Sequence, residues 1–115
     1  MLSLFDIVVV RFAYEDKPEV SKPRPAIIVG LSNGNAQLTF AKVTSHAPRP
    51  EFPGEVQLLD WREEGLAKPS TVRCSKLVCL AEEKVRCVVG HLTDRDSLAV
   101  RTGLNEIAAL TQPRP

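Results

Sequence analysis

Arg24 is the residue whose type and setting most clearly suit chemistry. It lies between Pro23 and Pro25, so both neighbours restrict the backbone and the guanidinium is presented from a stiff stem. A planar guanidinium in that setting suits a phosphate group. The more common role of such an arginine is a solvated or salt-bridged loop residue, so Arg24 alone does not specify a function.

Hydroxyl, imidazole and guanidinium groups follow in two later segments of the chain. Thr44, Ser45 and His46 stand where a predicted strand ends, and they can either serve a reaction or simply cap the strand with an exposed imidazole. Arg73 lies inside a strand-like segment. It either extends outward as an edge charge or faces the same concavity as Arg24.

Cysteine and histidine spacing does not match a metal site. The three cysteines, Cys74, Cys79 and Cys87, form an odd set without a close pair, and His46 and His91 are far from one another. We therefore expect buried thiols, no disulfide framework and no metal. The phosphate-binding patterns GxGxxG and GxxxxGK[ST] do not occur in the sequence either, so we expect no cofactor.

Length and composition predict a single globular domain. The chain has 115 residues, of which 43% are hydrophobic and 25% charged, and its formal net charge is +1. We expect one domain over residues 1–115, with frayed ends at 1–4 and 111–115. No apolar run approaches the roughly 18 residues of a membrane span and no signal-peptide pattern is visible, so we expect a cytoplasmic protein. The charge excludes a broadly basic nucleic-acid binder and leaves only a local patch.

Short β-branched runs between turn signals predict a mainly β fold. We predict strands at 6–12, 25–31, 36–43, 55–59, 71–80 and 84–89. Asn33-Gly34 favours a tight hairpin between the second and third strands, and we expect the last two strands to form another hairpin. The polar, proline-containing stretch between 13 and 23 predicts an exposed loop.

Two helices are expected. One or two helical turns should cover 60–66, ending at Gly65. A longer helix should begin after Thr93, which can act as its N-cap, with an apolar stripe formed by Leu98, Val100, Leu104, Ile107, Ala108 and Leu110. This order of elements suits a compact barrel on which a C-terminal helix packs.

Several motifs follow one another in the order in which a known family carries them. They are Asp6 to Phe12, Arg24-Pro25-Ala26, Val43-Thr44-Ser45, Gly65-Leu66 with Pro69 to Arg73, and Gly90-His91-Leu92 before the final helix. Together they resemble the MazF/PemK family of toxin endoribonucleases, from Asp6 to Leu110. The resemblance implies a single-domain SH3-like barrel with a short inserted helix and a C-terminal helix, forming a homodimer.

The resemblance also implies an activity and roles for matching residues. Such toxins cleave single-stranded RNA without a metal, usually at a preferred sequence, and a small antitoxin protein restrains them. The 2′-hydroxyl attacks the adjacent phosphorus and leaves a 2′,3′-cyclic phosphate. Arg24 matches the arginine that grips the phosphate, Thr44 with Ser45 matches the active-site hydroxyl position, and Arg73 matches a second cation or acid.

Further side chains are expected to hold RNA or to accept a proton. The expected RNA-binding residues are Lys22, Lys42, Ser70 and Lys76. His46 is a candidate base because imidazole titrates near neutral pH. The alternative bases are the loop acids Glu15, Asp16 and Glu19.

Three positions depart from the family pattern. Ala13 stands where the family commonly carries a proline after the first strand. Phe5 precedes the first strand where the family usually carries glycine, and Ser75 stands two residues after Arg73 where members often carry an aspartate. A serine cannot act as a carboxylate base. The alternative hypothesis is therefore a non-catalytic SH3-like module that retains the fold and binds RNA or a peptide.

Overall fold

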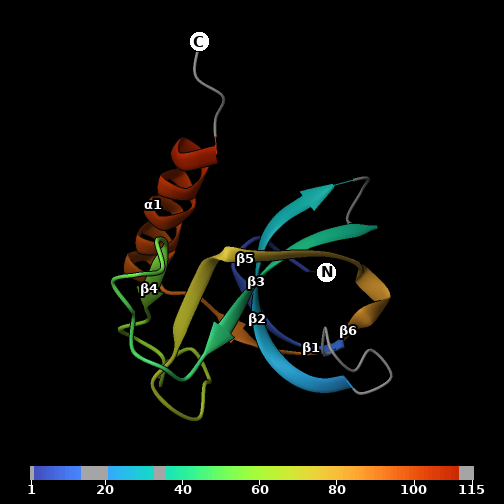
Figure 1. The fold of residues 1–115 in the computed structure, drawn as a ribbon. Helices are drawn as coiled ribbons and strands as arrows, with labels where there is room; N and C mark the ends of the chain where they lie inside the picture. Colours follow the sequence, from blue (N-terminus) through green and yellow to red (C-terminus); the bar gives the residue numbers. More distant parts are fainter. Residues whose placement is uncertain (1, 14–20, 33–35, 112–115) are drawn as a thin grey trace.

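A six-stranded antiparallel sheet forms the body of the molecule, with one helix beside it (Figure 1). The computed structural model describes residues 2–13, 21–32 and 36–111. The strands are β1 (Asp6–Ala13), β2 (Ser21–Ser32), β3 (Gln37–Thr44), β4 (Glu55–Gln57), β5 (Thr71–Ala81) and β6 (Val85–His91). The 3-10 turn η2 (Glu82–Lys84) joins β5 to β6, and the helix α1 spans Asp94–Thr111. The predicted Asn-Gly turn and the loop acids at 15–19 lie outside the described residues.

The strands pair in the order β4-β5-β3-β2-β1-β6. The hairpin of β2 and β3 is confirmed, with pairs running from Ala26↔Lys42 to Ser32↔Gln37. The second predicted hairpin is wrong, because β5 pairs with β3 and β4 whereas β6 pairs with β1. After η2 the chain leaves β5, and β6 pairs with the open edge of β1.

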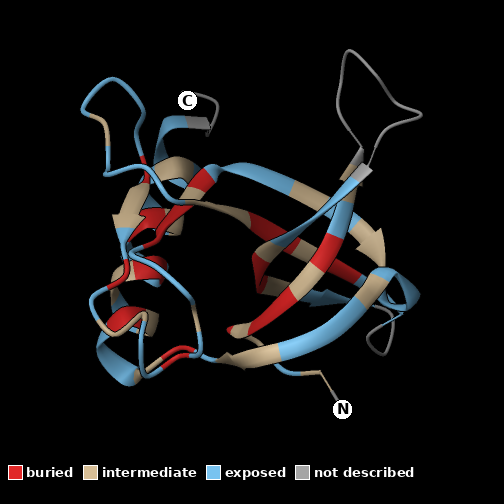
Figure 2. Cartoon of the chain, turned by 90° about the horizontal axis from the view of Figure 1, so that it is seen from below, coloured by how far each residue is buried: buried red, intermediate tan, exposed pale blue. Residues whose placement is uncertain are grey.

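Both faces of β1 and of the middle of β2 carry buried side chains, which explains the continuous apolar runs in the sequence. Val8 and Val10 of β1 pack with Ile28 and Phe40 on one face. Ile7 and its neighbours on the other face pack against the helix and the turns before it. Figure 2 shows the buried residues concentrated on the inner parts of the strands. Complete burial of each such side chain contributes about 1.5–3 kcal/mol, so the register is fixed from two sides.

The helix α1 begins as predicted, at a Thr93 cap. The Thr93 hydroxyl accepts a hydrogen bond from the Asp96 N–H at 3.4 Å, and the Thr93 carbonyl accepts one from Ser97 N–H at 2.8 Å. The inward face carries fully buried Val100, with Leu104 and Ile107 packed against the same core. The predicted stripe was too wide, because Leu98, Ala108 and Leu110 are exposed. Among the described residues, no helix combines the length and apolar character needed to cross a bilayer.

The segment at 60–66 is a series of hydrogen-bonded turns and not the predicted short helix. The Glu64 N–H donates to the Asp60 carbonyl at 3.0 Å, but Gly65 then adopts a positive φ of 93° and ends the helical path. Gly90 of β6 approaches this turn so closely that a Cβ there would lie 2.1 Å from the Glu64 carbonyl oxygen. The two glycines therefore let the turn press against β6.

The backbone conformation of Phe5 shows why the family pattern has a glycine at this position. Its φ is 69°, a left-handed conformation in which a glycine has no steric penalty. Its N–H donates to the Ile28 carbonyl at 2.7 Å and its carbonyl accepts from the Leu92 N–H at 3.1 Å, so the conformation is held on both sides. The ring is buried in the core, with the Arg101 guanidinium 5.1 Å from its centroid. Burial of the ring offsets the backbone strain.

We expect Phe5→Gly to be more stable than Phe5→Ala by about 1 kcal/mol, the reverse of the usual order. Both variants lose the buried ring, which costs about 3–5 kcal/mol in a core, but only alanine retains the penalty for the positive φ. Urea unfolding measures the difference. Ala109→Gly on the exposed side of α1 is the control and should show the ordinary loss of about 1 kcal/mol. A Phe5→Gly protein less stable than Phe5→Ala would refute strain at this position.

Candidate functional site

A cavity of about 540 Å³ opens among β2, β3 and β5, together with the turn at 45–46 after β3 and the segment 66–70 before β5. Eight of the nine predicted site residues line it: Lys22, Arg24, Lys42, Thr44, Ser45, His46, Ser70 and Arg73. Lys76 is exposed and is not part of this lining. Residues as far apart in the sequence as Lys22 and Arg73 therefore contribute to one surface.

Strand register brings these residues together. Lys42 of β3 pairs with Ala26 of β2 on one side and with Arg73 of β5 on the other. Arg24 lies two residues before Ala26, and Thr44 lies two residues after Lys42, so both stand at the same end of the ladder. The middle strand thus presents the hydroxyls, and an arginine comes from each flanking strand.

Lys76 lies beside an irregularity in β5. The pair Ala41↔Leu77 is followed by Lys42↔Arg73, so residues 74–76 of β5 are extra relative to β3. Residues three apart in a regular strand point to opposite faces, so Lys76 would face away from Arg73 even without this bulge. Ser75 lies in the same bulge and is exposed.

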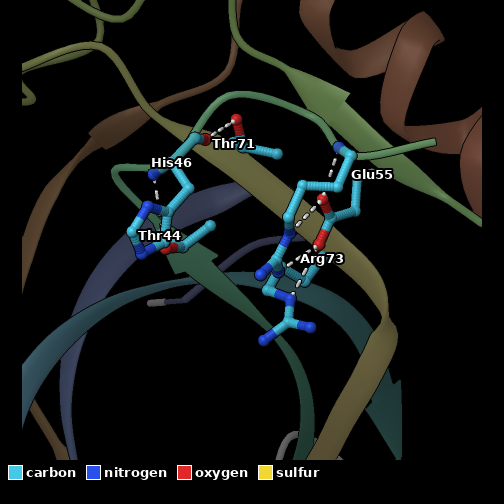
Figure 3. Close-up of polar contacts among 6 residues, drawn as sticks. Thr44, His46, Glu55, Thr71 and Arg73 are labelled. Atoms are coloured by element: carbon cyan, nitrogen blue, oxygen red, sulfur yellow. Dashed lines mark hydrogen bonds and ion pairs between the residues drawn. The ribbon is translucent and has the colours of Figure 1, made fainter. Parts of the chain in front are cut away.

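Hydrogen bonds hold the turn that carries the hydroxyls (Figure 3). The His46 N–H donates to the Thr44 hydroxyl at 3.4 Å, and the buried Thr71 hydroxyl donates to the His46 carbonyl at 2.5 Å. A threonine hydroxyl that accepts a hydrogen bond still has its own proton to donate. The Ser70 hydroxyl, by contrast, already donates to the Lys68 carbonyl at 2.8 Å. Thr44 is therefore better suited than Ser70 to donate to an anion.

Glu55 is a site residue that the sequence analysis missed. Its side chain is only 1% exposed, and Oε2 accepts hydrogen bonds from Arg73 Nε and from Arg49 Nη2, both at 2.9 Å. The bond from the Arg49 guanidinium is the largest cause that lowers the pKa of Glu55 to about 2, against the opposing effect of burial. A charged residue at the start of a predicted strand was the available signal, but only the structure shows its partner.

The cavity is cationic although the chain is almost neutral. Its lining includes five basic side chains, Lys22, Arg24, Lys42, Lys68 and Arg73, and no acidic one among the residues that the structure describes. Arg24 is exposed, and its side chain makes no hydrogen bond or ion pair within the described ranges. Lys42 lies 5.1 Å from the centre of the Phe12 ring. Such a surface suits a small anionic group such as a phosphate.

Comparison with known families now identifies the fold and its relatives. Residues 4–108 match the model of the PemK-like, MazF-like toxins of type II toxin–antitoxin systems. The chain belongs to this family. No match was found among curated proteins. The sheet order and C-terminal helix are those of the SH3-like barrel expected from the motifs.

Solved structures share the fold at low sequence identity. A mycobacterial endoribonuclease in complex with its cognate antitoxin matches with a TM-score of 0.72 and 18% identity, covering 100% of both chains. The Mycobacterium tuberculosis toxin MazF-mt6 matches with a TM-score of 0.66 and 20% identity, over 90% of this chain and 96% of that one. A MazE-MazF structure from Deinococcus radiodurans matches with a TM-score of 0.69 and 18% identity, over 94% and 96% respectively.

The thiols of this MazF-like chain are not part of the cavity. Cys74 is buried, and burial raises the pKa of its thiol to about 11, so it remains protonated. Cys79 and Cys87 are exposed, which corrects the expectation that all three are buried. His91 Nδ1 lies 2.8 Å from an Asp6 carboxylate oxygen, at the junction of β6 and β1.

Within the described residues, one group of acids is close enough to share a cation. It comprises Asp60, Glu64 and Asp96, whose carboxylate oxygens lie within 4.8 Å of one another. None of them lines the cavity. Asp96 already accepts the N–H groups of Leu59 and Asp60 at 3.0 and 2.9 Å, and Arg95 pairs with Asp60. These bonds tie the 58–64 turn to the start of α1, which is a structural role.

Glu64 carries a proton in this network below about pH 7. It is 2% exposed, its Oε2 accepts the Thr93 N–H at 2.8 Å, and its Oε1 has no hydrogen-bond partner. Burial is the main cause that raises the pKa of Glu64 to about 7, and the neighbouring Asp96 adds to it. A proton on Glu64 supplies the donor that this pair of acids otherwise lacks.

We expect Glu64→Gln to be more stable than the wild type at pH 8 and equal to it at pH 5. Because the folded-state pKa is raised from 4.5 to about 7, the stability that Glu64 contributes is fully present below pH 4.5 and is lost as pH rises through 7. Glutamine stays neutral and keeps both a donor and an acceptor. Thermal midpoints across pH 5–8 measure this, with exposed Glu63→Gln as the control. Equal pH slopes for Glu64→Gln and wild type would contradict it.

Proposed function

We propose that this chain is an endoribonuclease toxin that cleaves single-stranded RNA in the cytoplasm without a metal ion. The observation that carries the proposal is the cavity lined by five cations, with Thr44 on β3, the strand between those of Arg24 and Arg73. RNA phosphates are the anions that suit it. The net charge of +1 favours contacts to a few RNA phosphates at one site over broad binding driven by counterion release. Family membership and the mycobacterial endoribonuclease fold support the same activity.

The proposed reaction needs a cation, a hydrogen-bond donor and a proton acceptor. The substrate 2′-oxygen forms a bond to phosphorus while the bond to the 5′-oxygen breaks, giving a cyclic phosphate and a free 5′-hydroxyl. Arg24 and Arg73 would stabilise the negative charge on the phosphorane, and the Thr44 hydroxyl would donate to one of its oxygens. His46 would take the 2′ proton, since it is the one imidazole in the described lining, and the leaving 5′-oxygen would take a proton from water.

A specific observation supports the non-catalytic alternative. No carboxylate stands among the described lining residues, and Ser75 lies in the β5 bulge where relatives often carry the acid. A binding module would retain the cationic grip and lack the base. Incubation of the wild type with mixed single-stranded RNAs in EDTA separates the two functions, because only the enzyme leaves 2′,3′-cyclic phosphate ends.

Arg24→Ala is expected to slow cleavage in EDTA by about 10²- to 10³-fold, the cost of one lost charge-stabilising donor. The thermal midpoint should stay nearly unchanged, because Arg24 is exposed and its side chain makes no hydrogen bond or ion pair within the described ranges. Exposed Arg86→Ala on β6 is the matched control and should cleave normally. Wild-type rates from Arg24→Ala would remove this residue from the mechanism.

We further propose that the chain forms a homodimer and that a small acidic antitoxin covers the cavity. Structures with an antitoxin exist for the mycobacterial and Deinococcus radiodurans relatives. An acidic segment complements the five cations and would compete with RNA.

Where the neighbouring reading frame encodes a small acidic protein, that protein should therefore displace a labelled single-stranded RNA from the purified toxin. Fluorescence anisotropy measures the displacement, and light scattering should give about twice the chain mass of 12.7 kDa. RNA that stays bound in a ternary complex would contradict a shared site. A monomeric mass would contradict the dimer.

A further inference from the structure

Glu55 and Arg73 are direct neighbours in the sheet. The short edge strand β4 pairs with β5, and the register places Glu55 opposite Arg73. Opposite residues on paired strands have side chains close enough to interact. The edge strand therefore delivers a carboxylate to an arginine of the cavity.

Glu55 holds Arg73 by one nitrogen only. Arg73 Nε donates to Glu55 Oε2 at 2.9 Å, and the guanidinium end with its two Nη groups points away from the carboxylate (Figure 3). The guanidinium carbon also lies 5.3 Å from the centre of the Phe52 ring. Neither Nη group has a hydrogen-bond partner within the described residues. The donors best suited to a phosphate are thus left available.

Arg49 completes the anchoring of Glu55. Its backbone N–H and its Nε donate to Glu55 Oε1 at 2.9 and 3.3 Å, and its Nη2 donates to Oε2 at 2.9 Å. Glu55 is thereby held from the loop side while it holds Arg73 from the sheet side. The carboxylate cannot rotate away without losing several charge-assisted bonds.

These contacts rule out Glu55 as the base of the proposed reaction. A general base works best with a pKa near the operating pH, whereas that of Glu55 is about 2 because two guanidiniums bond to it. Its oxygens already accept four hydrogen bonds. Any effect of Glu55 on cleavage must therefore pass through Arg73.

We propose that Glu55 is a positioning residue that fixes the Arg73 guanidinium, by its Nε, in the orientation that presents both Nη groups to the scissile phosphate. The proposal rests on the proposed ribonuclease function. A free arginine side chain has several rotatable bonds and samples many orientations. Anchoring one nitrogen removes most of that freedom before RNA binds, which is how preorganised charges lower a reaction barrier.

A double-mutant cycle on single-turnover cleavage in EDTA tests the proposal. Arg73→Ala should slow the chemical step by about 10²- to 10³-fold, and Glu55→Gln by about 10- to 100-fold with little change in KM. The double variant should be no slower than Arg73→Ala alone, because Glu55 acts only through Arg73. The control is Glu51→Gln, at an exposed position in the loop before β4, which should cleave at the wild-type rate. If the rate losses of Glu55→Gln and Arg73→Ala multiply in the double variant, the proposal is overturned.

A measurement without RNA separates this proposal from the function on which it rests. In ¹H–¹⁵N spectra of the wild type, the Arg73 Nε–H should give a slowly exchanging signal, assigned by its loss in Arg73→Ala. Glu55→Gln should abolish its protection from exchange. If the signal behaves so but the wild type does not cleave RNA, the proposed function fails and the anchoring stands. An unchanged signal in Glu55→Gln would refute the anchoring.

Glu55→Asp covers the case in which Glu55→Gln does not fold. The aspartate keeps the negative charge near Arg49 but is one methylene shorter, so it should lose the bond to Arg73 Nε. We expect slowed cleavage and loss of the protected signal. A fully active Glu55→Asp protein that lacks the signal would also overturn the proposal.

Discussion

The pairing of Lys42 with strands on both sides is the constraint on which the site depends. Lys42 lies opposite Ala26 on one strand and opposite Arg73 on the other. A one-residue slip would turn every buried side chain of β3 to the wrong face. Because the buried side chains of β3 pack into two separate clusters, the slip is strongly disfavoured. The same burial that stabilises the fold therefore keeps Arg24, Thr44 and Arg73 at one end of the ladder.

Charge is separated within the molecule because the paired acids do not themselves line the cavity. Glu55 is held by two arginines, Asp60 by Arg95, and Asp96 by backbone N–H groups. Burial raises the pKa of Glu64 to about 7. The lysines and arginines of the described cavity lining have no acid among them. A chain with a net charge of +1 can thus present a strongly cationic surface of small extent.

The sequence predicted most of the elements, because their signals are local. Strand runs, the cap at Thr93 and the polar residues at strand ends all depend on neighbouring residues. The pairing of β6 with β1 could not be predicted in this way, since it depends on which sheet edges are left open. Glu55 was missed for a related reason. Its partner Arg73 is 18 residues away, and only the β4–β5 register joins them.

The central claim is that the cavity between β2, β3 and β5 holds a phosphate of single-stranded RNA. Its most direct test is an NMR titration of the wild type with an RNA whose reacting nucleotides lack the 2′-hydroxyl, so that it binds and is not cut. The account predicts saturable shifts at Arg24, Thr44 and Arg73, with none at Glu64 or Asp96. Shifts centred on another surface, or no saturable shifts at the cavity, would contradict it.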